Sequence, residues 1–269
     1  MTLWKIVLSY DGSGFHGWQV QPGRPTVQGT LSAVLEKMTG ERVLPQGSGR
    51  TDAGVHALAQ VASFALEAEI PAENLLRALN QALPQSIRVL KVEAAGEDFH
   101  ARHSAVRKTY EYRIFERRVE GADEERICPP FVAPYAWDCR WALEIAAMQQ
   151  AAAMLCGTHD FTSFAAVDPD RTQREDGAAG QNPVKTIFAS EVAREDGLLR
   201  YRVTGSGFLH HMVRNIVGTL VEVGRGSLQA EEMRRILAAK DRTAAGPTAP
   251  AQGLFLVGVE YDGGEGVEV

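Results

Sequence analysis

Four stretches of the chain carry apolar residues at the three- and four-residue spacing of a helix with one buried face. They predict helices over residues 26–39, 71–83, 141–156 and 209–223. Gly40 follows the first stretch, where a glycine typically ends a helix. Pro71 and Pro84 bound the second, because proline is tolerated at the start of a helix but not inside it.

Between these stretches, shorter runs are rich in strand-forming residues. They predict strands at residues 3–9, 58–66, 87–92, 108–116, 187–192, 199–203 and 254–261. Because strands and helices are mixed without strict alternation, we expect the α+β class with a mixed, largely antiparallel sheet. Each half of the chain holds strands plus two helices, which suggests a pseudo-twofold arrangement around a central cleft.

The proline-rich stretch from Pro129 to Pro134 marks a connection between two halves. We therefore expect an N-terminal α/β half at residues 1–116, a connection at 117–140 and a C-terminal α/β half at 141–269. Residues 167–182 are rich in Asp, Gly and Arg without an apolar period, so we interpret them as a surface insertion in the second half.

The composition indicates a globular protein, with 45% hydrophobic and 23% charged residues among 269. We expect no membrane role, because a bilayer span needs about 20 uninterrupted apolar residues and none occurs. The first ten residues include Lys5 and run into a turn, unlike a signal peptide, so a cytoplasmic location is expected. The three cysteines form no Cys-x-x-Cys pair and the histidine pairs lack acidic companions at ligand spacing, so we expect no metal site.

The net charge of -6 argues against a nucleic-acid partner, but the charges are unevenly distributed. Residues 100–118 hold a run of basic side chains interleaved with Tyr110, Tyr112 and Phe115. These basic side chains are Arg102, Arg107, Lys108, Arg113, Arg117 and Arg118. Cations for phosphates and rings for unstacked bases are typical of an RNA surface. A solvated strand with a half-buried aromatic face explains the same segment.

The most informative motif is the run from Gly47 to Ala57, which sets Asp52 between glycines with Arg50 two residues before it. Glycines permit backbone angles closed to other residues and let a ligand approach the main chain. An exposed Asp52 beside Arg50 would stay ionised and serve as a reacting carboxylate. The alternative is an ordinary loop whose Asp makes an Asx-turn.

The chain resembles the tRNA pseudouridine synthase A family nearly from end to end. The resemblance rests on motifs of which Arg50 to His56 is the most specific. The others include residues 10–12, 15–21, 26–29, 78–84, 99–102, 108–113, 157–161, 207–214 and 249–254. It implies a pseudouridine-synthase fold around a central RNA-binding cleft. It also implies isomerisation of uridine to pseudouridine at positions 38, 39 and 40 of the tRNA anticodon stem-loop, by a homodimer without a cofactor.

The resemblance implies a role for each site residue. Asp52 corresponds to the catalytic aspartate, Tyr110 to the ring that stacks on the target base, and Arg214 to the arginine that pairs with the aspartate. Arg50 corresponds to the residue that fills the space left by the flipped nucleotide. The residues expected to contact the substrate are Arg50, His56, Arg102, Lys108 and Tyr110.

One position departs from the family pattern, since Ala165 follows Phe164 where an arginine is usual. This leaves open how that region contacts RNA. Two other functions also remain open. A non-catalytic RNA-binding module would use the same basic-aromatic surface, and an Asp-dependent hydrolase would need a second carboxylate that the sequence does not offer convincingly. Whether Asp52 attacks C6 of the base or C1' of the sugar is likewise open.

Overall fold

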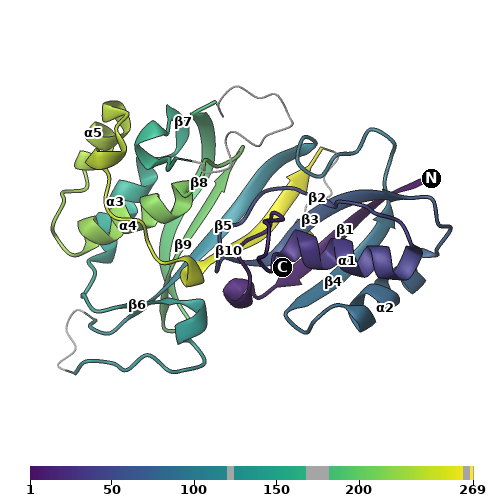
Figure 1. Cartoon of the computed structure of the whole chain (residues 1–269). Helices are drawn as coiled ribbons and strands as arrows, with labels where there is room; N and C mark the ends of the chain where they lie inside the picture. The colour runs from purple at the N-terminus through teal and green to yellow at the C-terminus, as the bar shows by residue number, and fades with distance from the viewer. Residues whose placement is uncertain (120–123, 168–181, 263–266, 269) are drawn as a thin grey trace. The chain divides into compact units, whose positions relative to one another are not determined.

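The computed structural model describes residues 1–119, 124–167, 182–262 and 267–268. The chain forms two compact units, with the elements labelled in Figure 1. Unit 1 comprises Met1–Thr109 together with Phe255–Val269, and unit 2 comprises Tyr110–Leu254. The last strand of the chain therefore returns to the unit in which the chain begins.

Unit 1 is built on a sheet whose two inner strands are buried on both faces. The strand order is β4 (Ile87–Ala94), β1 (Thr2–Tyr10), β3 (His56–Leu66) and β10 (Leu254–Tyr261). Neighbours are antiparallel except β3 and β10, which are parallel. Two short strands, β2 (Gln46–Gly47) and β11 (Val267–Glu268), pair with β3 and β10. Burial of both faces explains why β1 and β3 read as nearly continuous apolar runs rather than as alternating ones.

Both helices predicted for this part of the chain are confirmed. They are α1 (Val27–Thr39) and α2 (Ala72–Ala82), and a short 3₁₀ turn, η1 (Gly12–Gly14), precedes them. The Oγ1 atom of Thr26 accepts the N–H of Gly29 at 3.3 Å and caps α1. Gly40 ends α1 in the left-handed conformation, with φ at 77°. The leucine stripe of α2 is buried on the side of β4.

Unit 2 is built on a second group of strands. Their order is β5 (Ala105–Glu116), β9 (Leu198–Gly205), β8 (Val184–Glu195) and β7 (Gly157–Asp160), and β6 (Trp137–Cys139) runs parallel to β5. The first five residues of β5 belong to unit 1. A tight turn joins β8 to β9, and its residues Asp196 and Gly197 have φ of 51° and 78°. The pairs β7–β8 and β8–β9 are antiparallel, as expected for an α+β protein.

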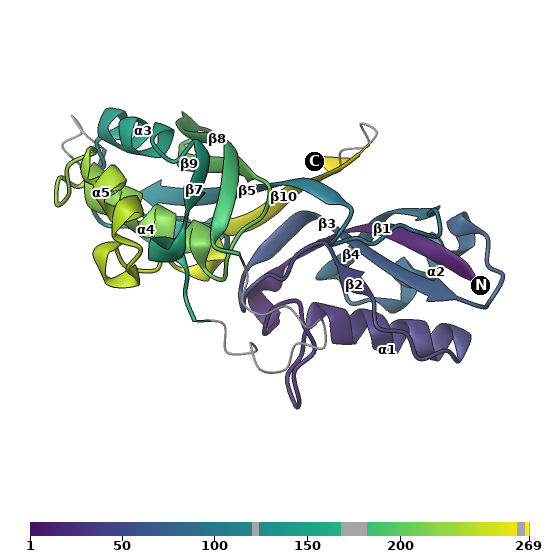
Figure 2. The same ribbon diagram turned by 90° about the horizontal axis from the view of Figure 1, so that it is seen from above.

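Three α-helices accompany these strands in the described part of unit 2, one more than the sequence predicts. They are α3 (Ile145–Ala153), α4 (Met212–Gly224) and α5 (Glu232–Ala239), and Figure 2 shows them beside β7, β8 and β9. Among the described residues are the 3₁₀ turns η2 (Ala133–Tyr135), η3 (Thr162–Phe164), η5 (Arg242–Ala244) and η6 (Ala251–Gly253). Helix α3 starts four residues later than predicted because the carboxylate of Glu144 caps it by accepting the N–H groups of Ala146 and Ala147.

The predicted α+β class with a mixed, largely antiparallel sheet is confirmed. The predicted domain division at residues 1–116, 117–140 and 141–269 stays a proposal. The two compact units of the structure have other bounds. Residues 168–181 of the predicted insertion lie outside the described residues. None of the described helices is both long and apolar enough to cross a membrane.

Candidate active site

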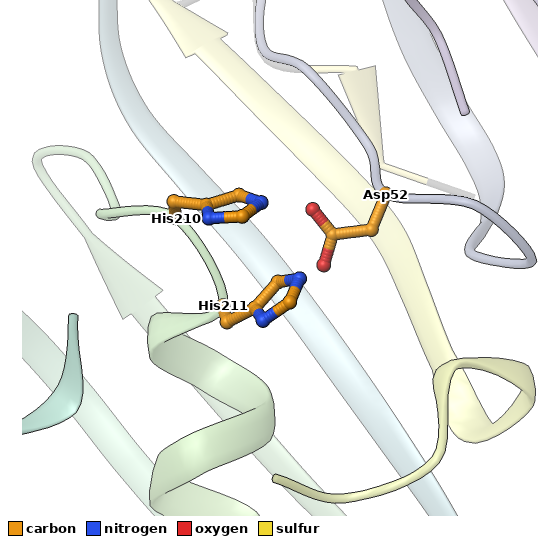
Figure 3. Close-up of side chains that lie close together, drawn as sticks. All are labelled: Asp52, His210 and His211. Carbon is orange, nitrogen blue, oxygen red and sulfur yellow. The ribbon is translucent and has the colours of Figure 1, made fainter. Parts of the chain in front are cut away.

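Asp52 lies on the loop between β2 and β3, and Figure 3 shows its side chain there. The side chain is partly exposed, and Arg50 on the same loop is exposed. The carbonyl oxygen of Asp52 accepts the N–H of Val55 at 3.1 Å, which closes a tight turn. Gly54 within this turn has φ of 76°, a left-handed conformation that favours glycine. The glycine of the motif therefore shapes the backbone that presents Asp52.

A second segment, residues 12–18, packs against the Asp52 loop through close backbone approaches. The N–H of Trp18 donates to the carbonyl of Thr51 at 3.0 Å, and the N–H of Gly54 donates to that of Phe15 at 3.3 Å. A Cβ atom added at Gly12 would lie 2.0 Å from the carbonyl oxygen of Val55. Only a residue without a side chain fits there, because both contacting groups are backbone.

We therefore expect Gly12→Ala to displace the Asp52 loop. The clash should cost about 1–3 kcal/mol of stability and should lower turnover with it. Gly14→Ala is the matched control, since a Cβ at Gly14 meets no heavy atom within 4 Å and the residue is exposed. Thermal unfolding and initial rates of both variants test this. Equal effects of the two substitutions would show that the close approach at Gly12 is unimportant.

His56 is the first residue of β3 and is buried, with 1% of its surface exposed. Its Nδ1 atom accepts the N–H of Gly12 at 3.1 Å, and its ring stacks on Phe255 at a centroid distance of 4.7 Å. Because the lone pair on Nδ1 is used, the neutral ring carries its proton on Nε2. An oxygen of Asp11 also lies 3.2 Å from Nδ1, but it accepts the N–H of Ser13 at 2.9 Å. This burial favours a structural role for His56 over a contact with RNA.

Arg102 and Lys108 are both half-buried residues of unit 1. The loop that carries Arg102 is tied to the core at Ala101, whose N–H donates to Ser63 at 3.1 Å and whose carbonyl accepts the hydroxyl of Tyr261 at 2.8 Å. The Nζ atom of Lys108 donates to the carbonyl oxygen of Ser48, within the glycine motif itself. Lys108 is thus a direct neighbour of the Asp52 loop, a contact that the sequence did not indicate.

His100 holds the backbone around Arg102. Its Nδ1 atom accepts the N–H of Arg102 at 3.0 Å. Burial lowers the pKa of His100, and the neighbouring His103 and Arg102 add to the effect. A neutral ring at physiological pH keeps Nδ1 available as the acceptor, so the backbone of Arg102 has a fixed position.

Tyr110 is the first residue of unit 2 and is 7% exposed. Its ring meets the ring of Phe208 edge to face, with centroids 5.0 Å apart and planes at 82°. This is a favoured geometry for two aromatic rings and fixes the plane of Tyr110. Phe208 was not singled out from the sequence, although it lies in the motif at residues 207–214 that carries Arg214.

Arg214 lies in the first turn of α4 and is half-buried. Its Nε atom donates to the carbonyl of Ala249 at 2.8 Å, and the N–H of Ala249 donates back to the carbonyl of Arg214 at 3.1 Å. Figure 3 shows His210 and His211 immediately before this helix, and His211 has φ of 59°. The first of these hydrogen bonds holds the guanidinium of Arg214, and the second joins the two backbones beside it.

The basic segment at residues 100–118 makes many of its contacts within the chain. Arg113 pairs with Glu111 at 2.7 Å, and Arg117 forms a two-pronged pair with Asp138 at 2.8 and 2.6 Å. The hydrogen bonds from Arg117 hold the pKa of Asp138 below its usual value. Glu111 is buried, as are Tyr112 and Phe115, so both faces of β5 are covered here. The acidic and aromatic residues named here are thus buried, whereas Arg113 and Arg117 are ion-paired and partly exposed, and the RNA surface stays a prediction.

A family model described as tRNA pseudouridine synthase matches residues 6–104 and 151–262, more than half of the chain. The chain belongs to the tRNA pseudouridine synthase family and is an isomerase that acts on uridines of tRNA. The matched residues include Asp52 and Arg214, whereas Lys108 and Tyr110 lie between the two matched segments.

Individual relatives agree over nearly the full length. A tRNA pseudouridine synthase A of Solibacter usitatus is 50% identical over 96% of this chain and 98% of its own length. Proteins of the same name from Moorella thermoacetica and Geobacillus kaustophilus are 45% and 43% identical. They align over 97% and 96% of this chain and 100% and 94% of their own lengths.

Proposed function

We propose that the protein converts uridine to pseudouridine at positions 38, 39 and 40 of the tRNA anticodon stem-loop, by base flipping and an aspartate-dependent mechanism. The observation that carries the proposal is the partly exposed Asp52 on its glycine-shaped turn, within a chain that is up to 50% identical to proteins named tRNA pseudouridine synthase A. The tRNA substrate would place the protein in the cytoplasm. We also propose that it acts as a homodimer.

The reaction breaks the N1–C1' bond of uridine, rotates the base and joins C5 to C1'. The proton on C5 is lost and N1 gains one, so the reaction needs no external reductant or oxidant. The reacting atoms are hidden in a stacked stem, and extruding the nucleotide costs roughly a few kcal/mol. The enzyme therefore has to hold the flipped base, stabilise charge at the sugar or base, and move a proton.

Three residues would perform these tasks. Asp52 would act as the nucleophile or stabilise positive charge at the sugar, and Arg214 would pair with its carboxylate. Tyr110 would stack on the uracil and offer a hydroxyl for proton transfer. The edge-to-face contact with Phe208 supports this role, since it holds the ring of Tyr110 in one plane.

The RNA contacts in this proposal come from Arg50, Arg102 and Lys108. Arg50 is exposed on the same loop as Asp52, so it would fill the space left by the flipped nucleotide. Arg102 has its backbone fixed by His100 and Ala101. Lys108 contacts the backbone of the Asp52 loop and would link the position of that loop to the presence of phosphate.

Tyr110→Phe is expected to keep stacking but to slow turnover by about 10²-fold, because only the hydroxyl is lost. Binding of tRNA should stay within about threefold. Tyr112→Phe serves as the control two residues along β5, where the hydroxyl donates to the carbonyl of Pro250 at 2.7 Å. Its loss should lower the melting temperature rather than the turnover number. Full activity of Tyr110→Phe would exclude a proton-transfer role for its hydroxyl.

The test of the proposed function is incubation of the purified protein with unmodified tRNA, without added metal, followed by mapping of pseudouridine. Product is expected at uridines 38, 39 and 40, and each signal should disappear when that uridine is replaced by cytidine. Binding without any product would support the RNA-binding module instead. Released base or nucleotide would support the hydrolase. Absence of pseudouridine from the anticodon arm would overturn the proposal.

A further inference from the structure

A buried network of polar side chains lies directly under the Asp52 loop. The hydroxyl of Tyr10 lies 2.7 Å from the Oγ1 atom of Thr51, the residue before Asp52. The Nε2 atom of Gln60 donates to the carbonyl of Gly49 at 2.9 Å and, more weakly, to the hydroxyl of Tyr10 at 3.4 Å. Its Oε1 atom accepts the hydroxyl of Ser48 at 2.7 Å. All these side chains are buried in unit 1, and we call Tyr10, Ser48, Thr51 and Gln60 the loop network.

The loop network leads from two strands to the backbone of the loop. Tyr10 is the last residue of β1 and Gln60 lies in the middle of β3, so both start from rigid, hydrogen-bonded strands. Their contacts reach Ser48, Gly49 and Thr51, three of the four residues before Asp52. The carbonyl of Thr51 also accepts the N–H of Trp18. Asp52 is thus the first residue of the loop beyond these anchors.

The network has one consistent set of donors and acceptors. Ser48 donates to Oε1 of Gln60, and Nε2 of Gln60 donates to Gly49 and Tyr10, which fixes the orientation of the amide. Tyr10 can then donate its own proton to Thr51. Burial raises the pKa of Tyr10 to about 12, so its hydroxyl stays protonated at any physiological pH.

Burial of a polar group costs free energy unless the group is hydrogen-bonded, and an apolar core would stabilise the fold equally well. Unlike apolar packing, a hydrogen-bonded network fixes the distance and direction between the atoms that it joins. We propose that the loop network, chiefly the Tyr10–Thr51 pair, positions Asp52 for catalysis. The inference rests on the proposed function. It adds Tyr10, Thr51 and Gln60 as positioning residues that touch neither the substrate nor the reacting atoms.

Two matched pairs of variants test the inference. Thr51→Val keeps the shape of the side chain and removes its hydroxyl, whereas Thr51→Ser keeps the hydroxyl. Tyr10→Phe removes one hydroxyl from a buried tyrosine. Tyr201→Phe does the same in unit 2, where the hydroxyl of Tyr201 lies 3.0 Å from that of Ser190 and the residue is equally buried.

Steady-state kinetics on tRNA should separate positioning from stability. Thr51→Val and Tyr10→Phe are expected to lower kcat by roughly ten- to 100-fold, with KM within about threefold, because small misplacements of a reacting group cost rate. Thr51→Ser should restore kcat to within about threefold of the parent. Tyr201→Phe should lower the melting temperature as much as Tyr10→Phe but leave kcat unchanged. The double variant Tyr10→Phe/Thr51→Val should be no slower than the slower single variant.

Amide hydrogen exchange gives a readout that does not depend on activity. The amides of residues 47–56 should exchange about tenfold faster in Thr51→Val and Tyr10→Phe, while those of Tyr201→Phe and Thr51→Ser match the parent there. If these amides exchange faster in Thr51→Val and Tyr10→Phe but the parent protein makes no pseudouridine, the loop network is upheld and the proposed function is overturned. Unchanged exchange, or a kcat that falls only in step with the melting temperature, would overturn the positioning role.

Discussion

Asp52→Asn is expected to abolish pseudouridine formation, a loss of roughly 10⁴-fold, while binding of tRNA persists. Asparagine has almost the same shape as aspartate, and the turn formed by the carbonyl of Asp52 with Val55 does not involve the side chain. The substitution therefore removes the charge and the nucleophilic oxygen and leaves the fold intact. Quantitative mapping of product, together with a tRNA binding titration at equal protein concentration, measures both quantities.

The control is Asp196→Asn, the same change on the turn between β8 and β9. Asp196 has φ of 51°, a conformation that asparagine tolerates well, and its ion pair with Arg200 is solvent-exposed and contributes little, so activity should be unchanged and stability nearly so. If Asp52→Asn lost tRNA binding and product in equal measure, Asp52 would be a structural residue. If Asp52→Ala kept the activity of the parent, the chain would make pseudouridine without this carboxylate, and the mechanism proposed above would be wrong.

Gly218→Ala is expected to produce the largest loss of stability of any single methyl added to a glycine of the described chain. A Cβ atom at Gly218 would lie 1.6 Å from the carbonyl oxygen of Pro247, because α4 packs there directly on the backbone of residues 246–249. The cost should be about 3 kcal/mol or more, a fall in melting temperature of roughly 6–12 °C. The same segment holds Ala249, the partner of Arg214, so turnover should fall as well.

Gly224→Ala, at the last residue of α4, is the matched control. Its Cβ atom would meet the side chain of Met148 at 2.7 Å, and a methionine can move aside whereas a carbonyl in a packed loop cannot. The loss in melting temperature should be less than half of that for Gly218→Ala. Thermal unfolding of the two variants checks this. An equal loss in melting temperature would mean that the backbone of residues 246–249 moves aside as easily as the side chain of Met148.

The elements that the sequence predicted best are those with local signals. Helix α1 has a capping threonine at its start and a glycine at its end, and α2 lies between two prolines. Strand β10 was predicted with the bounds that it has in the structure. These signals act within a few residues, so they hold whatever the tertiary fold is.

The elements that were missed depend on distant parts of the chain. Helix α5 has only eight residues, and its buried residues Met233, Ile236 and Leu237 are stabilised by packing near η3 and β7. The ion pairs of the basic segment were also missed. Arg117 pairs with Asp138, which lies 21 residues further along the chain. Ion pairs of this range cannot be recognised from composition.

In the candidate site, too, the features with local signals were predicted and those that depend on distant residues were not. The glycine motif already indicated that Asp52 sits on a specially shaped turn, and the left-handed Gly54 agrees with this. The motif did not reveal what lies beneath it. Tyr10 is 41 residues before Thr51, and the two hydroxyls meet only because β1 pairs with β3.

By itself, the sequence determined the fold class and the family and singled out Asp52 as the candidate for the reaction, because caps, apolar periods and the glycine motif are local properties of the chain. Only the tertiary structure decided which of the polar residues are buried supports and which remain accessible. The Nδ1 atom of His56 accepts the N–H of Gly12, Lys108 donates to the backbone of the Asp52 loop, and Arg214 donates to the carbonyl of Ala249. The physical reason is that a hydrogen bond depends on distance and direction in space, and the folding of the sheet sets both.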